Sequence, residues 1–291
     1  MTGASTGMGA ATARELARRG FYVLAGVRRD SDADALRTAN IEPVLLDITR
    51  PEQVQALADR ISADPDRRPL RALINNAGIG VIAPVEALPI AEWRRQFEVN
   101  LFGHVAVTQA LMPALLASSG RVVNISSLGG KVALPAYGAY AGTKFALEAV
   151  SDALRREVAP LGVQVVIVEP GGVRTEMNAR GAATARDVAA GMSGGQSDRY
   201  GQLVQAMIAH SAAFTRRGLP AEKAALVIAE ATTARHPRTR YTIGRDAALL
   251  TRLARIVPDR LLDRILAADL RPYYSKGTRS AQDLVGREAG R

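Results

Sequence analysis

Tyr140 and Lys144 stand four residues apart in the segment YAGTK, and together they could carry out a proton transfer. The i, i+4 spacing places both side chains on one face of the helix predicted over 140–159. A tyrosine normally titrates at a pH of about 10, and an adjacent ammonium group favours its phenolate. The pair is therefore suited to general acid–base catalysis; the alternative is a lysine that only packs beside a tyrosine.

A serine precedes this pair. Ser127 is the last residue of the segment RVVNISS and lies thirteen residues before Tyr140. Its hydroxyl could donate to a substrate oxygen while Tyr140 transfers the proton. A serine after a strand is also common in turns, so this residue alone leaves both interpretations open.

A glycine-rich segment, MTGASTGMGA, opens the chain. Gly3, Gly7 and Gly9 would let the backbone turn sharply toward a pyrophosphate, and the helix predicted in AATARELARRG would offer its N-terminal N–H groups. Such a turn requires a strand before it as well as a helix after it. Only Met1 and Thr2 precede the turn, so the position of the strand is an open question.

The elements that must hold these residues alternate between strands and helices. Short apolar runs predict strands at 21–27, 43–47, 70–74, 121–126, 163–169 and 240–244. Helical spacing follows the first turn and recurs at 51–62, 91–118, 140–159 and 221–235. A long loop is expected before the last of these helices, least ordered over 180–201.

Continuous apolar strands are typical of a parallel sheet that is covered on both faces. Right-handed crossovers then give one doubly wound, Rossmann-type α/β fold, with its ligand crevice beyond the carboxyl ends of the strands. We expect this domain to span 1–245, with a substrate lid at about 176–218 and a helical extension, 246–291, packed on it. In the extension, Pro258 breaks an amphipathic stretch whose basic, leucine-rich face could instead touch a membrane surface.

Composition excludes several classes of protein. The chain has 291 residues, 47% of them hydrophobic, and no cysteine, so it can bury a full core but has no disulfide or thiolate site. Its charge of +10 is spread in ones and twos, which favours solvated helix surfaces over nucleic-acid binding. We expect a cytoplasmic protein, because neither a signal peptide nor an uncharged apolar stretch long enough to span a membrane is visible.

Metal binding is also not expected. His104, His210 and His236 do not pair with a carboxylate or with one another at ligand spacing, so they are interpreted as structural.

Several short motifs of this chain, taken together and in their order along the sequence, resemble those of the short-chain dehydrogenase/reductase family. The matching segments are TGASTGMG, NNAG at 75–78, VN at 99–100, Ser127, YAGTK and PGGVRT at 170–175. The motifs span residues 2–175, and the order of elements fits the family to about residue 245. The resemblance implies an NAD(P)-dependent enzyme that interconverts a carbonyl and an alcohol.

The resemblance also implies site roles. Tyr140 would exchange the proton, Lys144 would bind the nicotinamide ribose and lower the tyrosine pKa, and Ser127 would orient the substrate oxygen. Asn100 would hold a water that links Lys144 to a proton relay. The cofactor would further be bound, from its adenine ring to its carboxamide, by Gly3, Ser5, Thr6, Gly7, Met8, Gly9, Asp47, Asn75, Ala77, Gly78, Pro170, Gly171, Val173 and Thr175.

The form of the cofactor depends on the residue after the strand at 21–27. An acidic residue there would accept a hydrogen bond from a free 2′-hydroxyl and repel a 2′-phosphate. The chain has Arg28 instead, which could pair with a 2′-phosphate beside the hydroxyls of the glycine-rich turn. NADP(H) is therefore the expected cofactor, and the nearby Asp30 leaves NAD(H) open.

The expected lid favours an apolar ketone or alcohol, because Met177, Met192, Met207 and Phe214 lie there among small residues; these side chains could also only pack. The segment AYGAYAGTKFALE and the tail resemble the branch of the family that acts on steroids, retinoids and similar lipids. The resemblance further implies a homo-oligomer assembled through the helix of Tyr140 and its neighbour.

The resemblance places the strand before the turn in the middle of the sheet. Its loss would leave buried backbone groups of both neighbouring strands unpaired. We therefore expect that the numbering starts late, with Met1 in the last strand position and roughly six residues before it. The alternative is a sheet with a gap or with a substitute strand.

Two other functions would use the same fold. A non-catalytic dinucleotide sensor would need none of Asn100, Ser127, Tyr140 and Lys144. An epimerase or dehydratase that retains its cofactor would usually show TGxxGxxG, whereas the glycines here fall at 3, 7 and 9.

Overall fold

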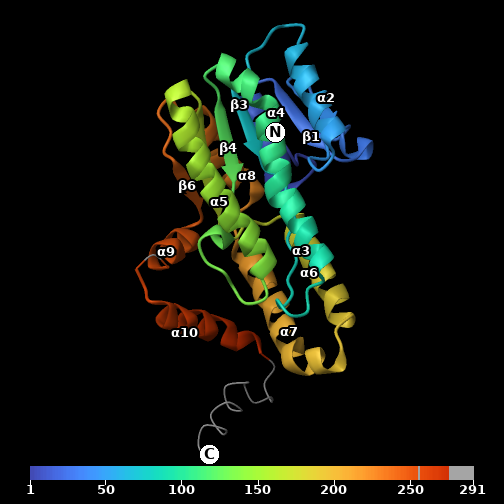
Figure 1. Ribbon diagram of the computed structural model, residues 1–291, viewed down its shortest axis with the longest axis vertical. Helices are drawn as coiled ribbons and strands as arrows, with labels where there is room; N and C mark the ends of the chain where they lie inside the picture. Colours follow the sequence, from blue (N-terminus) through green and yellow to red (C-terminus); the bar gives the residue numbers. More distant parts are fainter. Residues whose placement is uncertain (255, 275–291) are drawn as a thin grey trace, which may run out of the picture.

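The computed structural model describes residues 1–254 and 256–274, in which parallel strands alternate with helices (Figure 1). The strands are β1 (Val23–Val27), β2 (Ile41–Leu45), β3 (Ala72–Asn75), β4 (Arg121–Ile125), β5 (Gln164–Pro170) and β6 (Arg240–Ile243). The α-helices are α1 (Gly7–Arg18), α2 (Pro51–Ser62), α3 (Ile90–Phe97), α4 (Gly103–Ala117), α5 (Gly138–Val158), α6 (Glu176–Ala190), α7 (Gly194–Arg217), α8 (Ala221–Thr233), α9 (Arg245–Leu253) and α10 (Asp259–Leu270). Short turns complete the order: η1 (Asp30–Asp32), the π-helical η2 (Glu98–Phe102), η3 (Leu128–Gly130), η4 (Ala159–Leu161) and η5 (Arg271–Tyr273).

The strands pair in parallel, and the apolar runs explain why. β1 pairs with β2, while β3, β4, β5 and β6 pair in that order. Near the centre, Val122 of β4 pairs with Leu73 on one side and with Val165 on the other. Every residue of β4 is buried, as expected for a strand with helices on both faces.

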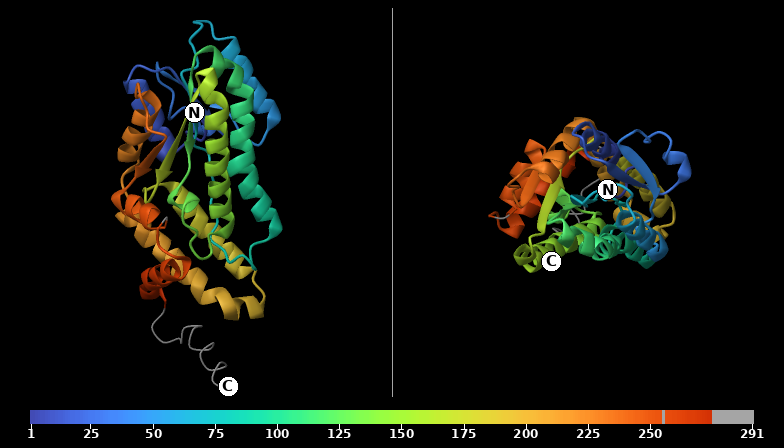
Figure 2. Two further views of the ribbon diagram at one scale, coloured as in Figure 1. Left: turned by 60° about the vertical axis from the view of Figure 1, so that its left-hand side comes forward. Right: turned by 90° about the horizontal axis from the view of Figure 1, so that it is seen from above.

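Helices cover both faces of the sheet (Figure 1, Figure 2). On one face, α1 and α8 pack on the strands through residues such as Leu16 and Ile228. On the other face, α2, α4 and α5 pack through residues such as Leu57, Leu111 and Val158. The doubly wound α/β fold predicted from the sequence is therefore confirmed.

The first residues of the chain join the two parts of the sheet. The Met1 amino group donates to Leu24 O at 2.8 Å, and Gly26 N donates to Met1 O at 2.8 Å. On the opposite side, Thr2 N donates to Ile74 O at 2.9 Å. Met1 and Thr2 thus lie between β1 and β3, in the strand position that the sequence predicts for Met1.

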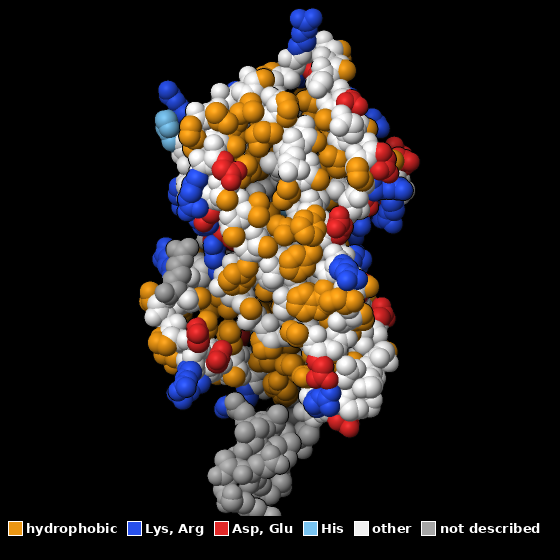
Figure 3. All heavy atoms as spheres, in the orientation of Figure 1, with side chains coloured by type: hydrophobic (Ala, Val, Ile, Leu, Met, Phe, Trp, Pro, Cys, Tyr) orange, Lys and Arg blue, Asp and Glu red, His pale blue; other side chains and the backbone are white. Residues whose placement is uncertain are grey.

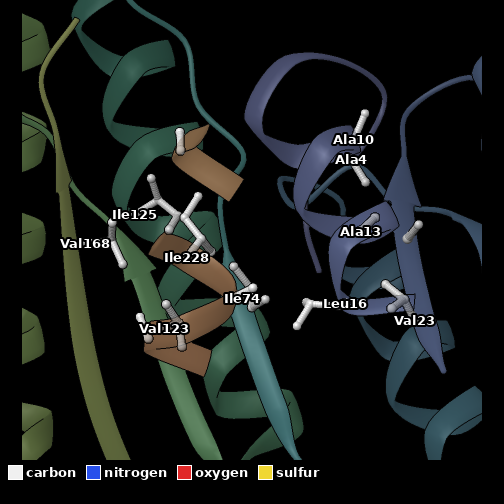
Figure 4. Packing of buried hydrophobic residues seen from close by; sticks show 14 of the residues in the cluster. Ala4, Ala10, Ala13, Leu16, Val23, Ile74, Val123, Ile125, Val168 and Ile228 are labelled. Atoms are coloured by element: carbon white, nitrogen blue, oxygen red, sulfur yellow. The ribbon is translucent and has the colours of Figure 1, made fainter. Parts of the chain in front are cut away.

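A cavity of about 470 Å³ continues from Met1 toward the amino ends of β1 and β3. Its lining is largely apolar and includes Leu16, Val23, Leu73 and Ile74. Figure 4 shows Val23 of β1 well separated from Ile74 of β3, with Leu16 of α1 close to the space between them. Among the described residues, β1 and β3 are connected only through the first residues of the chain, so the sheet has a gap at this position.

The segment between β5 and α8 is helical, and the prediction of a long loop there was wrong. Two helices, α6 and α7, fill it. Ser193 caps α7: its Oγ accepts from Gln196 N, and its own N–H donates to Gln196 Oε1 at 3.0 Å. Buried side chains such as Val204 and Met207 then hold α7 on the domain. The many Gly, Ala and Ser residues of 180–201 led to the prediction of a loop where α6 and α7 form.

The tail forms the two helices that the break at Pro258 predicts. α9 packs through Ala247, which is 1% exposed, and α10 packs through Leu270. The part of the predicted extension beyond residue 274 lies outside the described residues.

The helical run Ile90–Ala117 corresponds to the helix predicted over 91–118. Of the described residues, it alone is long and apolar enough to cross a membrane, with a mean hydropathy of 1.4 over its most apolar window. Its Val107, Leu111 and Leu115 are buried against the sheet, as in a core helix.

Candidate active site

A cavity of about 210 Å³ opens at the carboxyl ends of β3, β4 and β5, where a doubly wound sheet binds its ligands. It is lined by nine of the residues predicted from the sequence: Met8, Gly78, Ser127, Tyr140, Lys144, Pro170, Gly171, Val173 and Thr175. The other predicted residues are not part of this lining: Gly3, Ser5, Thr6, Gly7, Gly9, Arg28, Asp47, Asn75, Ala77 and Asn100.

The glycine-rich turn lies against the loop after β3. A Cβ on Gly9 would lie 2.1 Å from Gly3 O, and a Cβ on Gly3, whose φ is +64°, would lie 2.7 Å from Ala77 Cα. Both positions therefore require glycine. The turn leads into the N-terminus of α1, whose free N–H groups and dipole favour an anion.

An arginine of α6 reaches this turn, although the sequence analysis did not identify it. Arg180 Nη2 donates to Thr6 Oγ1 at 3.1 Å and also pairs with Glu176 at 3.0 Å. Its guanidinium therefore lies beside the N-terminus of α1, with Glu176 compensating its charge.

The two asparagines of NNAG point in different directions. Asn75 is fully buried, and its Nδ2 donates to Thr108 Oγ1 at 3.0 Å and to Asn124 Oδ1 at 2.9 Å. Asn76, by contrast, lines the cavity, and its Nδ2 donates to Gly3 O at 2.9 Å. The prediction chose Asn75 for the cofactor side, but its side chain joins the core, and Asn76 contacts the glycine-rich turn.

The Tyr140 ring is enclosed by two backbone segments. A Cβ on Gly80 would lie 3.2 Å from Tyr140 Cδ2, and a Cβ on Gly129 would lie 3.1 Å from Cε1. Ser127 stands at the start of η3, where its Oγ accepts from Gly129 N at 3.0 Å. These contacts bring Ser127 and Tyr140 together at the cavity, as the sequence predicts.

Burial controls the titration of the central pair. It raises the pKa of Tyr140 to about 12, with the Ser127 hydroxyl acting in the opposite direction. It also lowers the pKa of Lys144 to about 8, against the charge of Glu148. Desolvation dominates the pKa of Tyr140 in this structure, in which the Lys144 ammonium lies 6.0 Å from the centroid of the tyrosine ring.

Lys144 and Asn100 approach the same loop from two helices. Lys144 Nζ donates to Ile125 O at 2.9 Å. Asn100 lies in the π-helical turn η2, where its Nδ2 donates to Ile79 O at 2.8 Å and its Oδ1 accepts from Ile79 N at 2.9 Å. A Cβ on Gly78 would lie within 4 Å of both Asn100 Oδ1 and Lys144 Nζ, so the loop passes between them.

The residues expected at the adenosine end follow β1 and β2. Arg28 is exposed, while Arg29 pairs with Asp32 at 3.1 Å. The Arg29 guanidinium, the main cause, and the Ser5 hydroxyl lower the pKa of Asp32, so this carboxylate lies beside the glycine-rich turn. Asp47 Oδ1 accepts from Thr49 N at 3.0 Å, which occupies one of its oxygens in a local turn.

The opposite end of the cavity is apolar and is formed by the predicted lid and the tail. Met177 and Phe214 line it, together with Leu250 and Leu266. Met192 and Met207 do not, and Met207 is 1% exposed in the core.

A histidine also lines this end. His210 Nε2 lies 2.8 Å from Asp269 Oδ2 of α10, a contact between residues 59 positions apart that the spacing of residues along the sequence does not reveal. His104, in contrast, is buried and lies 2.7 Å from Ala77 O, and burial lowers its pKa to about 3. Within 1–254 and 256–274, no group of three His, Cys, Asp or Glu side chains could hold a metal ion.

Known proteins are similar to this chain over most of its length. The family model for short chain dehydrogenase matches residues 1–185. Retinol dehydrogenase 5 of Mus musculus is 38% identical over 278 residues, covering 91% of this chain and 86% of the relative. NADPH-dependent 3-dehydrocapnine reductase of Ornithobacterium rhinotracheale is 33% identical over 282 residues, covering 93% of this chain and 96% of the relative.

Several similar proteins have been solved with a bound nicotinamide dinucleotide. A short chain dehydrogenase from Burkholderia cenocepacia J2315 in complex with NADP is 28% identical, with a TM-score of 0.68, covering 92% of this chain and 94% of that one. A short chain dehydrogenase/reductase from Burkholderia phymatum in complex with NAD is 25% identical, with a TM-score of 0.73, covering 87% of this chain and 90% of that one. These matches make the protein an NAD(P)-dependent oxidoreductase, and the chain belongs to the short-chain dehydrogenase/reductase family.

Proposed function

We propose that the protein interconverts a carbonyl and an alcohol on a hydrophobic substrate with NADP(H), and that Tyr140 is the general acid and base. One observation carries this proposal. Ser127, Tyr140 and Lys144 line one cavity, which the glycine-rich turn also borders through Met8. A sensor would not need these three side chains at the cavity.

Each of these side chains has a role in the proposed reaction. When bound, the cofactor supplies or accepts the hydride. In reduction, the Tyr140 hydroxyl gives its proton to the carbonyl oxygen, and the Ser127 hydroxyl donates a hydrogen bond to the same oxygen. The Lys144 ammonium, whose pKa is about 8, is charged at neutral pH and stabilises the phenolate that remains. Asn100 holds the loop at Ile79 beside Lys144.

The residues around the turn fit a dinucleotide. The tight approach at Gly3 and Gly9 supports a backbone cradle at the N-terminus of α1, with Ser5, Thr6 and Gly7 in the same turn. Asp47, Ala77 and Gly78 would hold the adenosine side. Pro170, Gly171, Val173 and Thr175, which follow β5, would hold the nicotinamide side.

Arg28 supports NADP(H) over NAD(H). It follows β1, is exposed and could pair with a 2′-phosphate. The nearest competing feature is Asp32, which would accept from a free 2′-hydroxyl. Because Asp32 already pairs with Arg29 at 3.1 Å, its charge is compensated.

The apolar end of the cavity supports a hydrophobic substrate under a lid of α6 and α7. The domain of 1–245 would then carry the chemistry, and α9 and α10 would complete the pocket, since Leu250 and Leu266 line it. The outer side of α10 exposes Leu261 and Ile265, and we propose a peripheral membrane contact there.

An oligomer is supported by the face of α4 and α5. Apolar side chains gather on the face of the molecule that includes these helices (Figure 3). Phe102, Leu116, Phe145 and Val150 are all more than a third exposed there. Such a patch is typical of an interface, and a second copy is the proposed partner.

The first experiment is a fluorescence titration of the 291-residue protein with NADPH and, separately, with NADH. We expect tighter binding of NADPH. Reduction of all-trans-retinal and of 2-decanone is then followed by the consumption of NADPH. Binding of neither dinucleotide, or binding without reduction of any carbonyl in a wider panel, would contradict the proposed function.

A further inference from the structure

A group of charges, made of two buried carboxylates and two partly exposed cations, lies outside the cavity, where α5 meets β5 and β6. This charge cluster consists of Lys131, Glu148, Glu169 and Arg240. Lys131 Nζ lies 2.6 Å from Glu148 Oε2 and 3.5 Å from Glu169 Oε1. Arg240 Nη2 lies 3.1 Å from Glu148 Oε2, and its Nε lies 3.3 Å from Glu169 Oε1. Each cation therefore contacts both carboxylates.

The two carboxylates are almost completely removed from water. The side chains of Glu148 and Glu169 are 6% and 5% exposed. Burial raises the pKa of Glu169, and the charge of Glu148 acts in the same direction. Buried ion pairs often contribute no more stability than apolar residues of the same size. Stability alone therefore does not explain why four charges occupy this place.

Each member belongs to a segment that carries part of the active site. Lys131 ends the turn η3 that Ser127 begins. Glu148 lies one helical turn after Lys144 on α5. Glu169 lies on β5, next to Pro170, which lines the cavity. Arg240 opens β6 and joins the two carboxylates from the opposite side.

The turn η3 packs tightly against α5. A Cβ on Gly130 would lie 2.6 Å from Ser126 Oγ, and 3.1 Å from both Glu148 Cγ and Lys144 O. A small shift of Glu148 would therefore move η3 relative to α5. Such a shift would change the separation of Ser127 from Tyr140.

Glu148 also acts on Lys144 through its charge. The groups around Lys144 are Tyr140 on the same helix, and His104 of α4, which is neutral because burial lowers its pKa to about 3. The groups around Glu148 are Lys131, Arg240 and Glu169, with Asp152 beyond Arg240. Among the described residues, Glu148 is the carboxylate whose charge opposes the loss of the proton from buried Lys144.

We propose that Glu148 is a positioning residue: held by Lys131 and Arg240, it fixes the Ser127 turn on α5 and places a negative charge one helical turn from Lys144. This inference rests on the proposed function, because it assumes that Ser127 and Lys144 act in the proposed reaction.

The test compares Glu148→Gln with Asp152→Asn. Both changes remove one negative charge from α5 and one partner of Arg240, but Asp152 lies a turn farther from Lys144 and does not contact Lys131. The first readout is the pH dependence of the NADPH dissociation constant, measured by fluorescence. Because Glu148 opposes deprotonation of Lys144, its loss should move the alkaline midpoint down by about one pH unit. Asp152→Asn should leave the midpoint in place.

The second readout is kcat at neutral pH, which should fall roughly tenfold in Glu148→Gln and less than about twofold in Asp152→Asn. Lys131→Met should reproduce the loss of kcat, and Lys131→Arg should restore most of it. Unchanged alkaline midpoints, or equal losses of kcat in the Glu148 and Asp152 variants, would overturn the positioning role. Failure of the proposed function is distinct, because the unmodified protein would then reduce no carbonyl.

Discussion

Gly129 lies directly against the Tyr140 ring: a Cβ at this glycine would be 3.1 Å from Tyr140 Cε1 and 3.5 Å from Ser127 Oγ. The absence of a side chain at Gly129 therefore allows the Ser127 hydroxyl and the Tyr140 phenol to share one side of the cavity. Gly80 supports the opposite edge of the ring, with a Cβ distance of 3.2 Å to Cδ2. The position of Tyr140 thus depends on two glycines as much as on its own helix.

We expect Gly129→Ala to lower kcat/KM by about tenfold, because the added Cβ pushes the ring by a few tenths of an ångström, and a displacement of roughly 1 Å can cost about a hundredfold in rate. Initial rates of ketone reduction measure the effect. Gly201→Ala in α7 is the control, because no atom lies within 4 Å of the Cβ it would add. It should stabilise the fold by about 0.5–1 kcal/mol and leave the rate unchanged. Wild-type rates for Gly129→Ala would mean that the ring is not confined.

Tyr140→Phe removes the proposed proton donor. We expect kcat to fall by about 10²- to 10⁴-fold while NADPH still binds. Tyr137→Phe is the matched control, because its ring centroid lies 6.1 Å from that of Tyr140, and its hydroxyl donates to Ser211 at 3.1 Å. Steady-state rates measure the loss of proton transfer, and dinucleotide titrations show whether the cofactor still binds. Tyr137→Phe should change both much less than Tyr140→Phe changes the rate. Similar losses in both variants would remove Tyr140 from the role of donor.

The shared helix face of Tyr140 and Lys144 could be predicted from the sequence, because i, i+4 spacing on a helix fixes which side chains share a face. The parallel strands were equally readable, since runs such as RVVNIS and VQVVIVE have no alternation. Helix faces and buried strands can be predicted because each depends on residues within one short segment of the sequence. The doubly wound order of β3 to β6 follows from it through the handedness of the crossovers.

Features that depend on distant contacts were not predictable in this way. His210 meets Asp269 across 59 positions of sequence, and only the packing of α10 on α7 brings them together. The choice between Asn75 and Asn76 depends on which amide faces the core. The raised pKa of Tyr140 depends on burial, which no spacing of residues reveals.

Lys144 should make the stability of the protein depend on pH. Burial lowers its pKa from 10.5 to about 8, so between these values the unfolded chain binds a proton that the folded chain does not. Stability therefore rises with pH in this window. Tyr140 opposes this above its unfolded pKa of 10.0, because its folded pKa is raised to about 12. From pH 8 to pH 10, the free energy of unfolding should increase by about 2 kcal/mol.

Urea unfolding at these two pH values measures the increase for the protein without cofactor. Lys144→Met has no group that titrates at this position, so it should lack the increase. If the variant and the unmodified protein show the same pH dependence, then Lys144 is charged in the folded state throughout this range.

Arg28→Ala tests the form of the cofactor. If Arg28 pairs with the 2′-phosphate, its loss should raise the NADPH dissociation constant by about 10- to 100-fold and leave that of NADH within about twofold. Arg37→Ala is the control, because it removes another exposed arginine between β1 and β2 and leaves the pair of Arg29 and Asp32 intact. Fluorescence titrations give all four constants. An equal change for NADPH and NADH would show that Arg28 does not distinguish them.

The cavity between β1 and β3 predicts that the fold accepts an additional strand. The Met1 amino group donates to Leu24 O at 2.8 Å, and burial lowers its pKa from 8.0 to about 5. The unfolded chain therefore binds a proton between these values that the folded chain does not, so stability is present above pH 8 and falls as the pH drops toward 5. The fall should reach about 4 kcal/mol.

An extension of Val-Ile-Val-Ile before Met1 should change both the stability of the protein and its dependence on pH. Its backbone can pair with β1 and β3, and its side chains can enter the cavity of about 470 Å³. We expect stability at pH 7, measured by urea unfolding, to increase by at least about 2 kcal/mol, from apolar burial and from the conversion of the amine to an amide. A Gly-Ser-Gly-Ser extension also removes the amine, so it should abolish the decline between pH 8 and pH 5 without filling the cavity. Equal stabilities of the two extended proteins would show that the gap cannot take a strand, whereas a higher stability of the apolar extension alone would show that the sheet is completed there.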